Sequence, residues 1–411
     1  MFSIIGNSST NFRKNQIWAL WFFYLVPGYT HFVKKKLKVG ILFGGKSAEH
    51  EISLLSAKNI YDALDRDKYE PLLIGIDKNG RWLLNDESRF LLDADDPRRI
   101  RLNPSSAAVA LVPQSRGAIS NLSASKKDPD KEQSMERAVD VIFPMLHGPF
   151  GEDGTVQGLL KLADIPFVGA GVLASAAGMD KDVFKRLLRD AGLPIAKFRT
   201  LRQGEKVPDF EELCAELGTP LFVKPVNMGS SVGISKIRSQ KEYLSALEDA
   251  FQYDTRVMVE EFIPGRELEC SVLGSSFGKL NSDSGVEASA VGEVKPSHEF
   301  YSYDAKYIDE NGAELTIPAQ VSAETARRVQ ELAIAVFNTL CCEGLGRVDF
   351  FLKEDGSVII NEINTMPGFT RISMYPKLWE ASGLSYTELL DRLITLALQC
   401  FEREKKLKTS V

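Results

Sequence analysis

The sequence predicts a combined α/β and α+β fold that begins with a Rossmann-like domain built on a parallel sheet. Two apolar runs typical of buried strands, residues 38–43 and 69–77, flank a helical pattern near residues 51–64. A strand, a helix and a strand in this order form a βαβ unit, which implies a parallel sheet covered by helices. Further along, residues 346–352 and 358–364 alternate apolar and polar side chains around a turn, which predicts an antiparallel hairpin.

The composition is that of a globular protein with two or three domains. The 411 residues are 44% apolar and 26% charged. The net charge is -6, and no cluster of Lys and Arg is interleaved with aromatic residues, so we expect no nucleic-acid partner. Five cysteines without metal-ligand spacing indicate reduced thiols, and therefore a cytoplasmic protein.

The first 36 residues differ from the rest of the chain. Residues 17–26 (IWALWFFYLV) resemble the apolar part of a signal peptide, but no small-residue cleavage site follows them. As a helix this run spans about 15 Å, half of the hydrocarbon core of a bilayer, so we expect no stable membrane insertion. We expect residues 1–36 to be a disordered extension or the result of a start assigned too far upstream, with Val33 as a candidate first residue.

Changes of pattern divide the remaining chain into three expected domains. The first contains the Rossmann-like sheet and a Ser- and Ala-rich surface excursion at residues 103–136. The second opens with a helix that Asp180 caps and Gly192 ends, and the third carries a long apolar-faced helix that Gly344 stops. The expected domains are residues 37–175, 176–257 and 258–400, with a tail at residues 401–411.

Residues 40–47 (GILFGGKS) match the Walker A pattern of phosphate-binding loops. Such a loop turns directly after its first glycine, so that backbone N–H groups surround a phosphate. Here the apolar run continues from Leu37 through Phe43, so a strand occupies the positions that should turn. We therefore expect Gly44 and Gly45 to form a tight turn at the end of this strand, and no P-loop.

The predicted hairpin aligns acidic side chains. Period-two geometry places Arg347 and Asp349 on one face of the first strand. The same geometry places Glu362 and Asn364 on one face of the second strand. With a four-residue loop at 354–357, Asp349 lies opposite Glu362. Like charges in this position are destabilising, and a hard divalent cation between them reverses the effect. Two carboxylates and an amide oxygen suit magnesium; the alternative is a solvated strand face with an ordinary Arg–carboxylate pair.

A lysine and a loop of small residues indicate a phosphate site. Lys224 ends the apolar strand at residues 221–225, and its ammonium group would be a point charge held on a rigid element. Residues 227–233 (NMGSSVG) would let backbone N–H groups approach an anion closely. Lys181 begins a helix, and the N-terminus of a helix favours anions. Each of these signals is weak by itself.

Three further segments offer weaker signals. The backbone next to Ile263 suits the edge of an adenine, and Glu267 can accept hydrogen bonds from ribose hydroxyls, although both could belong to an ordinary surface. His147 follows a buried strand, where a lone histidine is more often structural. The polar, tyrosine-rich residues 298–312 could form a lid.

With these elements in order, the sequence resembles the D-alanine:D-alanine ligases, a family of ATP-grasp enzymes. The resemblance covers residues 37–398 and depends on a combination of motifs: GGKSAEHEIS, HGPFGEDGTVQG, MDKDVFK, VKPVNMGSSVG, EEFIPGRELE, EFYSYDAKY, GRVDFF and NEINTMPGF. It implies an ATP-grasp fold, with ATP held between the central and C-terminal sheets. It also implies two magnesium ions, or manganese in their place, on the C-terminal hairpin, and a homodimer.

Carried onto matching positions, the resemblance assigns residues to the nucleotide and its metal ions. Lys181 and Lys224 would bind phosphates, and Lys306, on the lid, would reach the γ-phosphate. The implied ligands of adenosine and magnesium are Glu260, the backbone of Ile263, Glu267, Asp349, Glu362 and Asn364.

The resemblance also assigns the two amino-acid sites. Glu49 would bind the ammonium group of the first D-alanine and connect through Ser230 to Tyr307 on the lid. His147 would lie near the carboxylate of that substrate. The residues implied for the oxyanion and the second carboxylate are Arg347, the N–H of Gly368, Ser373 and Met374.

The implied reaction joins two D-alanines in two steps, for peptidoglycan precursor synthesis. ATP phosphorylates the first carboxylate, and the amine of the second D-alanine attacks the acyl phosphate. Tyr307 favours an amine acceptor over D-lactate, because ligases that make D-alanyl-D-lactate generally lack this tyrosine; D-serine stays open as the second substrate. More distant alternatives are another ATP-grasp carboxylate–amine ligase and a non-catalytic nucleotide-binding regulator, which has no use for Arg347 beside a metal.

Overall fold

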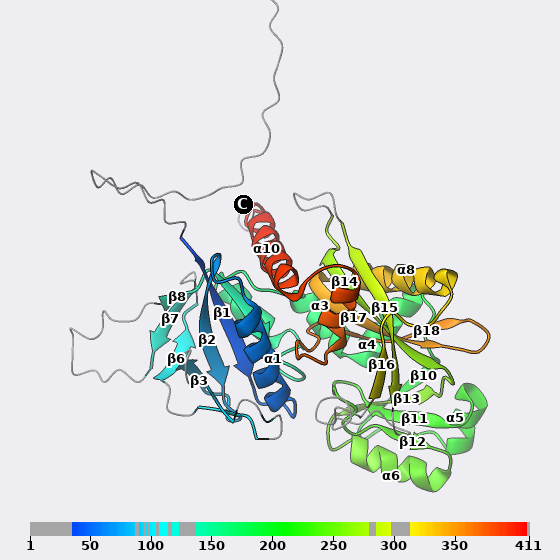
Figure 1. Cartoon of the computed structure of the whole chain (residues 1–411). Coiled ribbons are helices and arrows are strands. Elements are labelled where there is room, and N and C mark those ends of the chain that lie inside the picture. Colours follow the sequence, from blue (N-terminus) through cyan, green and yellow to red (C-terminus); the bar gives the residue numbers. More distant parts are fainter. Residues whose placement is uncertain are drawn as a thin grey trace, which may run out of the picture. The chain divides into compact units, whose positions relative to one another are not determined.

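A seven-stranded, a four-stranded and a five-stranded β-sheet organise the part of the protein that the structure describes (Figure 1). The structure is a computed structural model, and it describes residues 35–86, 90–93, 96, 99–103, 107–113, 117–122, 137–278, 285–296 and 313–408. The N-terminal extension up to residue 34 and the lid residues Lys306 and Tyr307 lie outside the described residues.

The predicted βαβ unit is confirmed in the seven-stranded sheet, next to its edge strand β9 (Val141–Met145). Strand β1 (Leu37–Gly44) pairs in parallel with β2 (Tyr69–Ile76) and with β9. Helix α1 (His50–Ala63) connects β1 to β2. Alternate residues of β1 enter two different cores, one with α1 and the other with α2 (Thr155–Leu162). Both faces of the strand are therefore covered, which explains its continuous apolar run.

The seven-stranded sheet is mixed rather than purely parallel. Beyond β2 it continues with the antiparallel strands β3, β6, β7 and β8, which are Trp82–Asn85, Ala107–Leu111, Ala118–Asn121 and Arg137–Ala138. A separate ribbon pairs β4 (Leu91–Leu92) with β5 (Arg101–Leu102). The expected surface excursion at residues 103–136 thus contains two strands of the sheet, β6 and β7. Such short strands of small residues carry little periodic signal.

The four-stranded sheet is antiparallel. Its strands, in the order β10, β13, β11 and β12, are Phe198–Arg202, Arg256–Glu261, Leu221–Pro225 and Ser235–Ile237. Buried residues of α5 (Phe210–Leu217) and α6 (Gln240–Ala250) form one hydrophobic core with this sheet. The expected domain boundary after residue 257 falls inside β13, because this strand pairs along its length with β10 and β11.

Helix α4 (Lys181–Asp190) follows α3 (Val172–Met179) and begins as the sequence predicts. The Asp180 carboxylate caps it by accepting a hydrogen bond from the N–H of Val183 at 3.0 Å. Its buried residues include two that the apolar pattern did not contain, Asp182 and Lys185.

The five-stranded sheet is antiparallel and is covered by helices on both faces. Its strands, in the order β16, β15, β14, β17 and β18, are Ala313–Thr316, Glu287–Pro296, Arg266–Ser275, Glu343–Leu352 and Val358–Asn364. One face shares a core with α3, α4 and the long helix α8 (Ala323–Thr339). On β14 and β15, α9 (Met374–Ala381) covers the other face.

The predicted hairpin is confirmed, with one difference in its geometry. Asp349 lies opposite Glu362, as predicted. The turn is one residue longer than expected, because Leu352 pairs with Val358. A β-bulge after Asp349 leaves Asn361 without a cross-strand partner in the β17–β18 ladder, and this extra residue restores the predicted alignment of the two acids.

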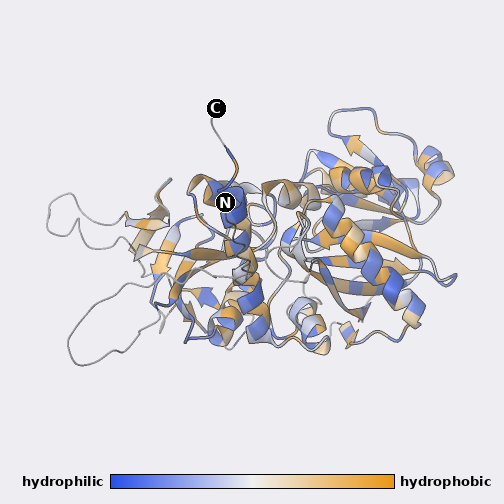
Figure 2. Cartoon of the chain, turned by 90° about the horizontal axis from the view of Figure 1, so that it is seen from above, coloured by the Kyte–Doolittle hydropathy of each residue, from blue (hydrophilic) through white to orange (hydrophobic). Residues whose placement is uncertain are grey.

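Helix α10 (Tyr386–Glu404) packs against elements of both the seven-stranded and the five-stranded sheet. Its buried residues share one hydrophobic core with β1, β9 and α1, and it also contacts β14 and β17. The helix continues through residues 401–404, which the sequence pattern assigned to the tail. Helical ribbons in Figure 2 alternate between hydrophilic and hydrophobic residues, as expected of helices that cover sheets. Among helices formed by the described residues, none has the length and apolar character needed to cross a membrane.

Candidate active site

The Walker-like segment forms a strand and a tight turn. Strand β1 runs through Gly44, and Gly44 and Gly45 have φ angles of +92° and +98°. The N–H of Gly45 donates to the carbonyl oxygen of Ile76 at 2.9 Å, which fastens the turn to β2. Lys46 is exposed, with its Nζ 5.7 Å from the centre of the Phe150 ring. The prediction that this segment is not a P-loop is confirmed.

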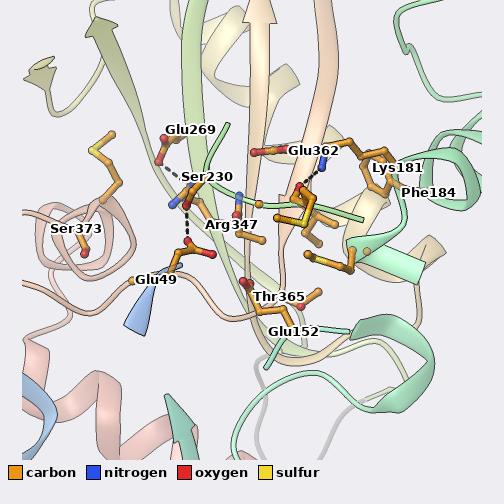
Figure 3. Close-up of a pocket in the computed structure, with 18 of the residues that line it drawn as sticks. Glu49, Glu152, Lys181, Phe184, Ser230, Glu269, Arg347, Glu362, Thr365 and Ser373 are labelled. Carbon is orange, nitrogen blue, oxygen red and sulfur yellow. Dashed lines mark hydrogen bonds and ion pairs between the residues drawn. The ribbon is translucent and has the colours of Figure 1, made fainter. Parts of the chain in front are cut away.

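One cavity collects most of the predicted site residues that the structure describes (Figure 3). Its walls come from the turn after β1, the small-residue loop at 227–233, and the β17–β18 hairpin with the loop that follows it. The predicted residues that line it are Glu49, Lys181, Ser230, Arg347, Glu362, Asn364, Gly368, Ser373 and Met374. Residues associated with all three sheets therefore converge on one place.

Glu49 connects the N-terminal part of the chain to the small-residue loop. It directly precedes α1, and its side chain is buried. The Ser230 hydroxyl donates a hydrogen bond to Glu49 Oε1 (Figure 3). A Cβ on Gly148 would lie 2.6 Å from Glu49 Oε2, and one on Gly229 would lie 3.2 Å away, so both glycines leave room for this carboxylate.

A second carboxylate, Glu152, lines the same cavity although no sequence pattern singles it out. It accepts hydrogen bonds from the N–H of Gly148 at 2.7 Å and the N–H of Met366 at 3.3 Å. Burial raises the pKa of Glu152, and the negative charge of Glu49 raises it further, to about 8. Its position in the motif HGPFGEDG, close to His147, was the one available signal.

His147 and Glu152 both bind the backbone of Met366, one at its carbonyl oxygen and the other at its N–H. His147 Nδ1 lies 3.1 Å from the carbonyl oxygen of Met366, whose N–H binds Glu152. Burial lowers the pKa of His147 to about 4, so the neutral ring donates through Nδ1. Its Nε2 has no hydrogen-bond partner among the residues that the structure describes. The loop at 365–369, which carries Gly368, is thereby fastened to the N-terminal part of the chain.

Three acidic side chains form a row across β14, β17 and β18. Glu269 lies opposite Asp349, which lies opposite Glu362. Arg347 Nε is 2.7 Å from Asp349 Oδ1 and 2.8 Å from Glu269 Oε2. Arg347 Nη2 and Asn364 Nδ2 both donate to Asp349 Oδ2, at 2.8 and 3.1 Å. The sequence pattern did not assign Glu269 to the site, because the acids beside it in this row lie about 80 or more residues away in the sequence.

The oxygen atoms of the hairpin have the chemistry that a hard divalent cation requires. Asp349 and Glu362 place carboxylates on adjacent strands, and Asn364 adds an amide; these are donors that magnesium accepts. Glu362 and Asn364 line the cavity. Within the described ranges, no group of three or more His, Cys, Asp or Glu side chains is placed to hold a metal ion. The set therefore needs further oxygen ligands, which nucleotide phosphates can supply.

Two lysines share the carboxylate of Glu260. Lys224 Nζ lies 2.6 Å from Glu260 Oε2, and Lys185 Nζ pairs with Oε1. Burial alone would raise the pKa of Glu260, but the two ammonium groups outweigh this effect and lower the pKa to about 2. Lys181, one turn before Lys185 on α4, donates to the carbonyl oxygen of Met228 in the small-residue loop. The predicted phosphate-binding elements are thus neighbours in the fold.

The residues expected to hold adenosine lie outside the cavity. Ile263 and Glu267 are partly exposed, one in the turn after β13 and the other on β14. Glu267 lies opposite Phe351 of β17. Both oxygens of Glu260 face lysines, as described above.

The start of α9 forms the opposite end of the cavity. Ser373 directly precedes this helix, and its Oγ would lie 2.8 Å from a Cβ on Gly368. The Met374 side chain packs with Val294 and Leu378 and therefore belongs to a hydrophobic core. Met374 is also the first residue of α9, so its backbone N–H lies in the first turn of this helix. Such N–H groups attract anions.

Comparisons with known proteins agree over nearly the whole chain. The family model described as D-ala D-ala ligase N-terminus matches residues 38–170, and the one described as D-ala D-ala ligase C-terminus matches residues 187–395. The D-alanine–D-alanine ligase of Shouchella clausii is 52% identical over 379 residues, which cover 92% of this chain and 98% of that relative. D-alanine–D-alanine ligase A of Escherichia coli is 51% identical over 378 residues, 92% of this chain and 100% of the relative.

Solved structures similar to this chain are also ligases of this kind. The D-alanine-D-alanine ligase from Coxiella burnetii matches with a TM-score of 0.76 at 37% identity, over 90% of this chain and 96% of that one. The VanG D-Ala:D-Ser ligase from Enterococcus faecalis matches with a TM-score of 0.74 at 35% identity, over 88% and 100%. The mixed α/β fold and the cavity define the class, an ATP-dependent, ADP-forming ligase of the ATP-grasp type. The chain belongs to the D-alanine–D-alanine ligase family.

Proposed function

We propose that this enzyme joins two molecules of D-alanine to D-alanyl-D-alanine, with conversion of ATP to ADP and phosphate, for peptidoglycan precursor synthesis. The observation that carries the proposal is the convergence of different chemical groups in one cavity. Glu49 offers a carboxylate for an ammonium group, Arg347 offers a cation for an oxyanion, and Glu362 belongs to a set of metal-binding donors. A protein that only bound a nucleotide would have no use for the first two groups.

The first step would activate one D-alanine. Its ammonium group would bind the Glu49 carboxylate, which the Ser230 hydroxyl orients. Its carboxylate would attack the γ-phosphorus of ATP, so that a carboxyl oxygen–phosphorus bond forms and the bond to the ADP oxygen breaks. His147 would lie near this carboxylate, and Tyr307 would close the lid through Ser230.

Cations would stabilise the charge on the transferring phosphoryl group. Asp349, Glu362 and Asn364 would hold a magnesium ion, which would supply positive charge to the phosphate oxygens. The adenosine would lie between the central and C-terminal sheets. The proposed phosphate ligands are Lys181, Lys224 and Lys306. The proposed ligands of two magnesium or manganese ions are Asp349, Glu362 and Asn364. The proposed adenosine ligands are Glu260, Ile263 and Glu267.

The second step would form the peptide bond. The amine of the second D-alanine would attack the carbonyl carbon of the acyl phosphate, the C–N bond would form, and phosphate would leave with the electron pair of the C–O bond and the proton that the amine loses. Arg347 and the N–H of Gly368 would bind the oxyanion of the tetrahedral intermediate. Ser373 and the N-terminus of α9 at Met374 would hold the carboxylate of the second substrate. A closed lid would exclude water and so protect the acyl phosphate.

A substrate panel tests the proposal. Phosphate release from ATP and product mass are measured with D-alanine, D-serine, D-lactate and L-alanine, singly and in pairs with D-alanine. We expect D-alanine alone to support sustained release and to yield the dipeptide, with L-alanine inactive. D-serine as the second substrate is the other candidate, and the match to a D-Ala:D-Ser ligase favours testing it. Turnover that requires D-serine or D-lactate beside D-alanine would refute D-alanine as the acceptor.

Domain division, location and assembly complete the proposal. We propose domains at residues 37–175, 176–257 and 258–400; strand β13 crosses the second boundary, because it pairs within the central sheet. We also propose a cytoplasmic location, which the cysteine pattern supports, and a homodimer, which the family resemblance alone supports. Light scattering of the purified enzyme measures its mass in solution, and a monomer mass at assay concentrations would contradict the dimer.

A further inference from the structure

Lys185 is a buried lysine that the proposed reaction does not use. It lies on α4 with its side chain only 2% exposed. Lysine is almost never fully buried unless its charge is paired. Its ammonium group contacts the carboxylate of Glu260 on β13. Burial lowers the pKa of Lys185 in spite of this partner, so the position is costly for a cation.

Glu260 is shared between a deep lysine and a more accessible one. Its Oε1 pairs with Lys185 and its Oε2 lies 2.6 Å from Lys224. The Lys224 side chain is 13% exposed, against 3% for Glu260. The three groups together carry one positive charge. Lys224 is therefore the member of this cluster that can reach a ligand, and Lys185 is the member that cannot.

Lys181 and Lys185 are spaced four residues apart on α4, which places them on one side of the helix. Lys181 lines the cavity, whereas Lys185 is turned against β13. Lys181 can therefore contact a phosphate in the cavity, whereas Lys185 forms an ion pair with Glu260.

A buried carboxylate that loses its last cation is strongly destabilised. If Lys224 leaves Glu260 for a phosphate oxygen, Glu260 still has Lys185. If Lys185 were absent, the same movement would leave Glu260 as an uncompensated charge in a site closed to water. Lys224 would then be held by Glu260 and would bind a phosphate less well.

We propose that Lys185 is a positioning residue, which neutralises Glu260 so that Lys224 can transfer from Glu260 to a phosphate group of the nucleotide. This inference rests on the proposed binding of ATP phosphates by Lys224. It gives Lys185 no contact with a substrate, and it makes Glu260 the group through which Lys185 acts.

Lys185→Met removes the charge and keeps most of the side-chain volume. We expect the affinity of the full-length enzyme for ATP, measured by isothermal titration calorimetry, to fall by about tenfold or more, because Lys224 stays with Glu260. The KM for D-alanine should change by less than about twofold, since that site is independent of the cluster. Added to Glu260→Gln, Lys185→Met should weaken ATP binding by less than about threefold relative to Glu260→Gln alone, because no carboxylate then retains Lys224 and any contact of Glu260 with adenosine is missing from both variants.

Arg186→Met is the matched control, because it removes a cation from the next position of α4, where the side chain is 59% exposed. It should leave the ATP affinity unchanged. An unchanged affinity in folded Lys185→Met would overturn the proposal, and so would a loss of affinity of about tenfold when Lys185→Met is added to Glu260→Gln. If Lys185→Met does not fold by itself, this second comparison decides: ATP binding about tenfold weaker in the folded double variant than in Glu260→Gln overturns the role of Lys185.

Lys224→Met separates this inference from the proposed function. If Lys224→Met binds ATP as the original enzyme does, the phosphate site itself is wrong. If Lys224→Met loses affinity while Lys185→Met keeps it, the phosphate site stands and the role of Lys185 is wrong.

Discussion

Single residues of the candidate site take their charge from their neighbours, as two glutamates show. Burial raises the pKa of both Glu152 and Glu260. For Glu152 the negative charge of Glu49 adds to this effect, and the pKa reaches about 8. For Glu260 two ammonium groups reverse it, and the pKa falls to about 2. Glu152 is therefore largely protonated at neutral pH, whereas Glu260 is a permanent anion.

Glu152→Gln should change how stability depends on pH. The pKa of Glu152 is about 8 in the folded state, against an ordinary value of 4.5 for a glutamate in the unfolded chain. Between these two pH values the folded state binds more protons than the unfolded state. The free energy of unfolding therefore falls as the pH rises from about 5 to 8, by at most ~1.4 kcal/mol per pH unit from this group. Glutamine keeps the neutral form, so the variant should lose stability less steeply when urea denaturation is measured across this range.

The control for Glu152→Gln is Glu70→Gln, which changes an exposed glutamate on β2. Its stability should follow the same pH dependence as the original protein. Identical slopes for Glu152→Gln and the original would show that Glu152 does not hold a proton in the folded state.

At the scale of elements, the β17–β18 hairpin shows how register places chemistry. A shift of one residue moves every side chain of a strand to the other face of the sheet. The turn is one residue longer than the sequence suggested, and the bulge at Asn361 compensates for it. Glu362 therefore stays opposite Asp349, on the face that borders the cavity. Local alternation was enough to predict this pairing, although the bulge itself leaves no mark in the pattern.

Glu362→Gln tests the element that carries the proposed metal site. We expect magnesium-dependent phosphate release to fall by about 100-fold or more, because one charged oxygen ligand is lost. The midpoint of thermal unfolding should stay close to that of the original enzyme, since the side chain borders a cavity and not the core. Glu354→Gln, in the exposed turn of the same hairpin, should keep full activity. Full activity of Glu362→Gln would rule out this metal ligand.

At the scale of the whole molecule, the described parts are held together by a core that spans the chain. Buried residues of β1, α1 and β9 pack with those of α9 and α10 in one hydrophobic cluster. The loop that carries Gly368 is tied to the same region, because the N–H of Phe369 donates to Ser56 Oγ at 3.2 Å. The cavity depends on this packing, since it takes residues from both ends of the chain.

Leu393→Ala should destabilise the whole protein. Leu393 is completely buried in this shared core on α10. We expect the loss of methyl groups to reduce the free energy of unfolding by about 3 kcal/mol, as measured by urea denaturation. Leu162→Ala, on α2 with 70% of the residue exposed, should cost less than about 0.5 kcal/mol. An effect of Leu393→Ala as small as that of Leu162→Ala would mean that α10 contributes little to the shared core.

Features that depend on neighbours along the chain could be predicted from the amino-acid sequence. The period of apolar residues predicted the βαβ unit at β1, and the type of residue before α4 predicted the cap at Asp180. Continuous apolar residues excluded a P-loop at residues 40–47. The motifs together identified the family, because each keeps several functional groups at fixed spacing.

Contacts between charged side chains from different elements became apparent in the folded chain and not before. Glu152 shares a cavity with Glu49, Lys185 neutralises Glu260, and Glu269 joins the row of hairpin acids. Each of these partners lies on another element, so no local pattern records the pair. The physical reason is that the charge and reach of a side chain depend on its burial and on the groups within a few ångströms of it, and folding alone determines both.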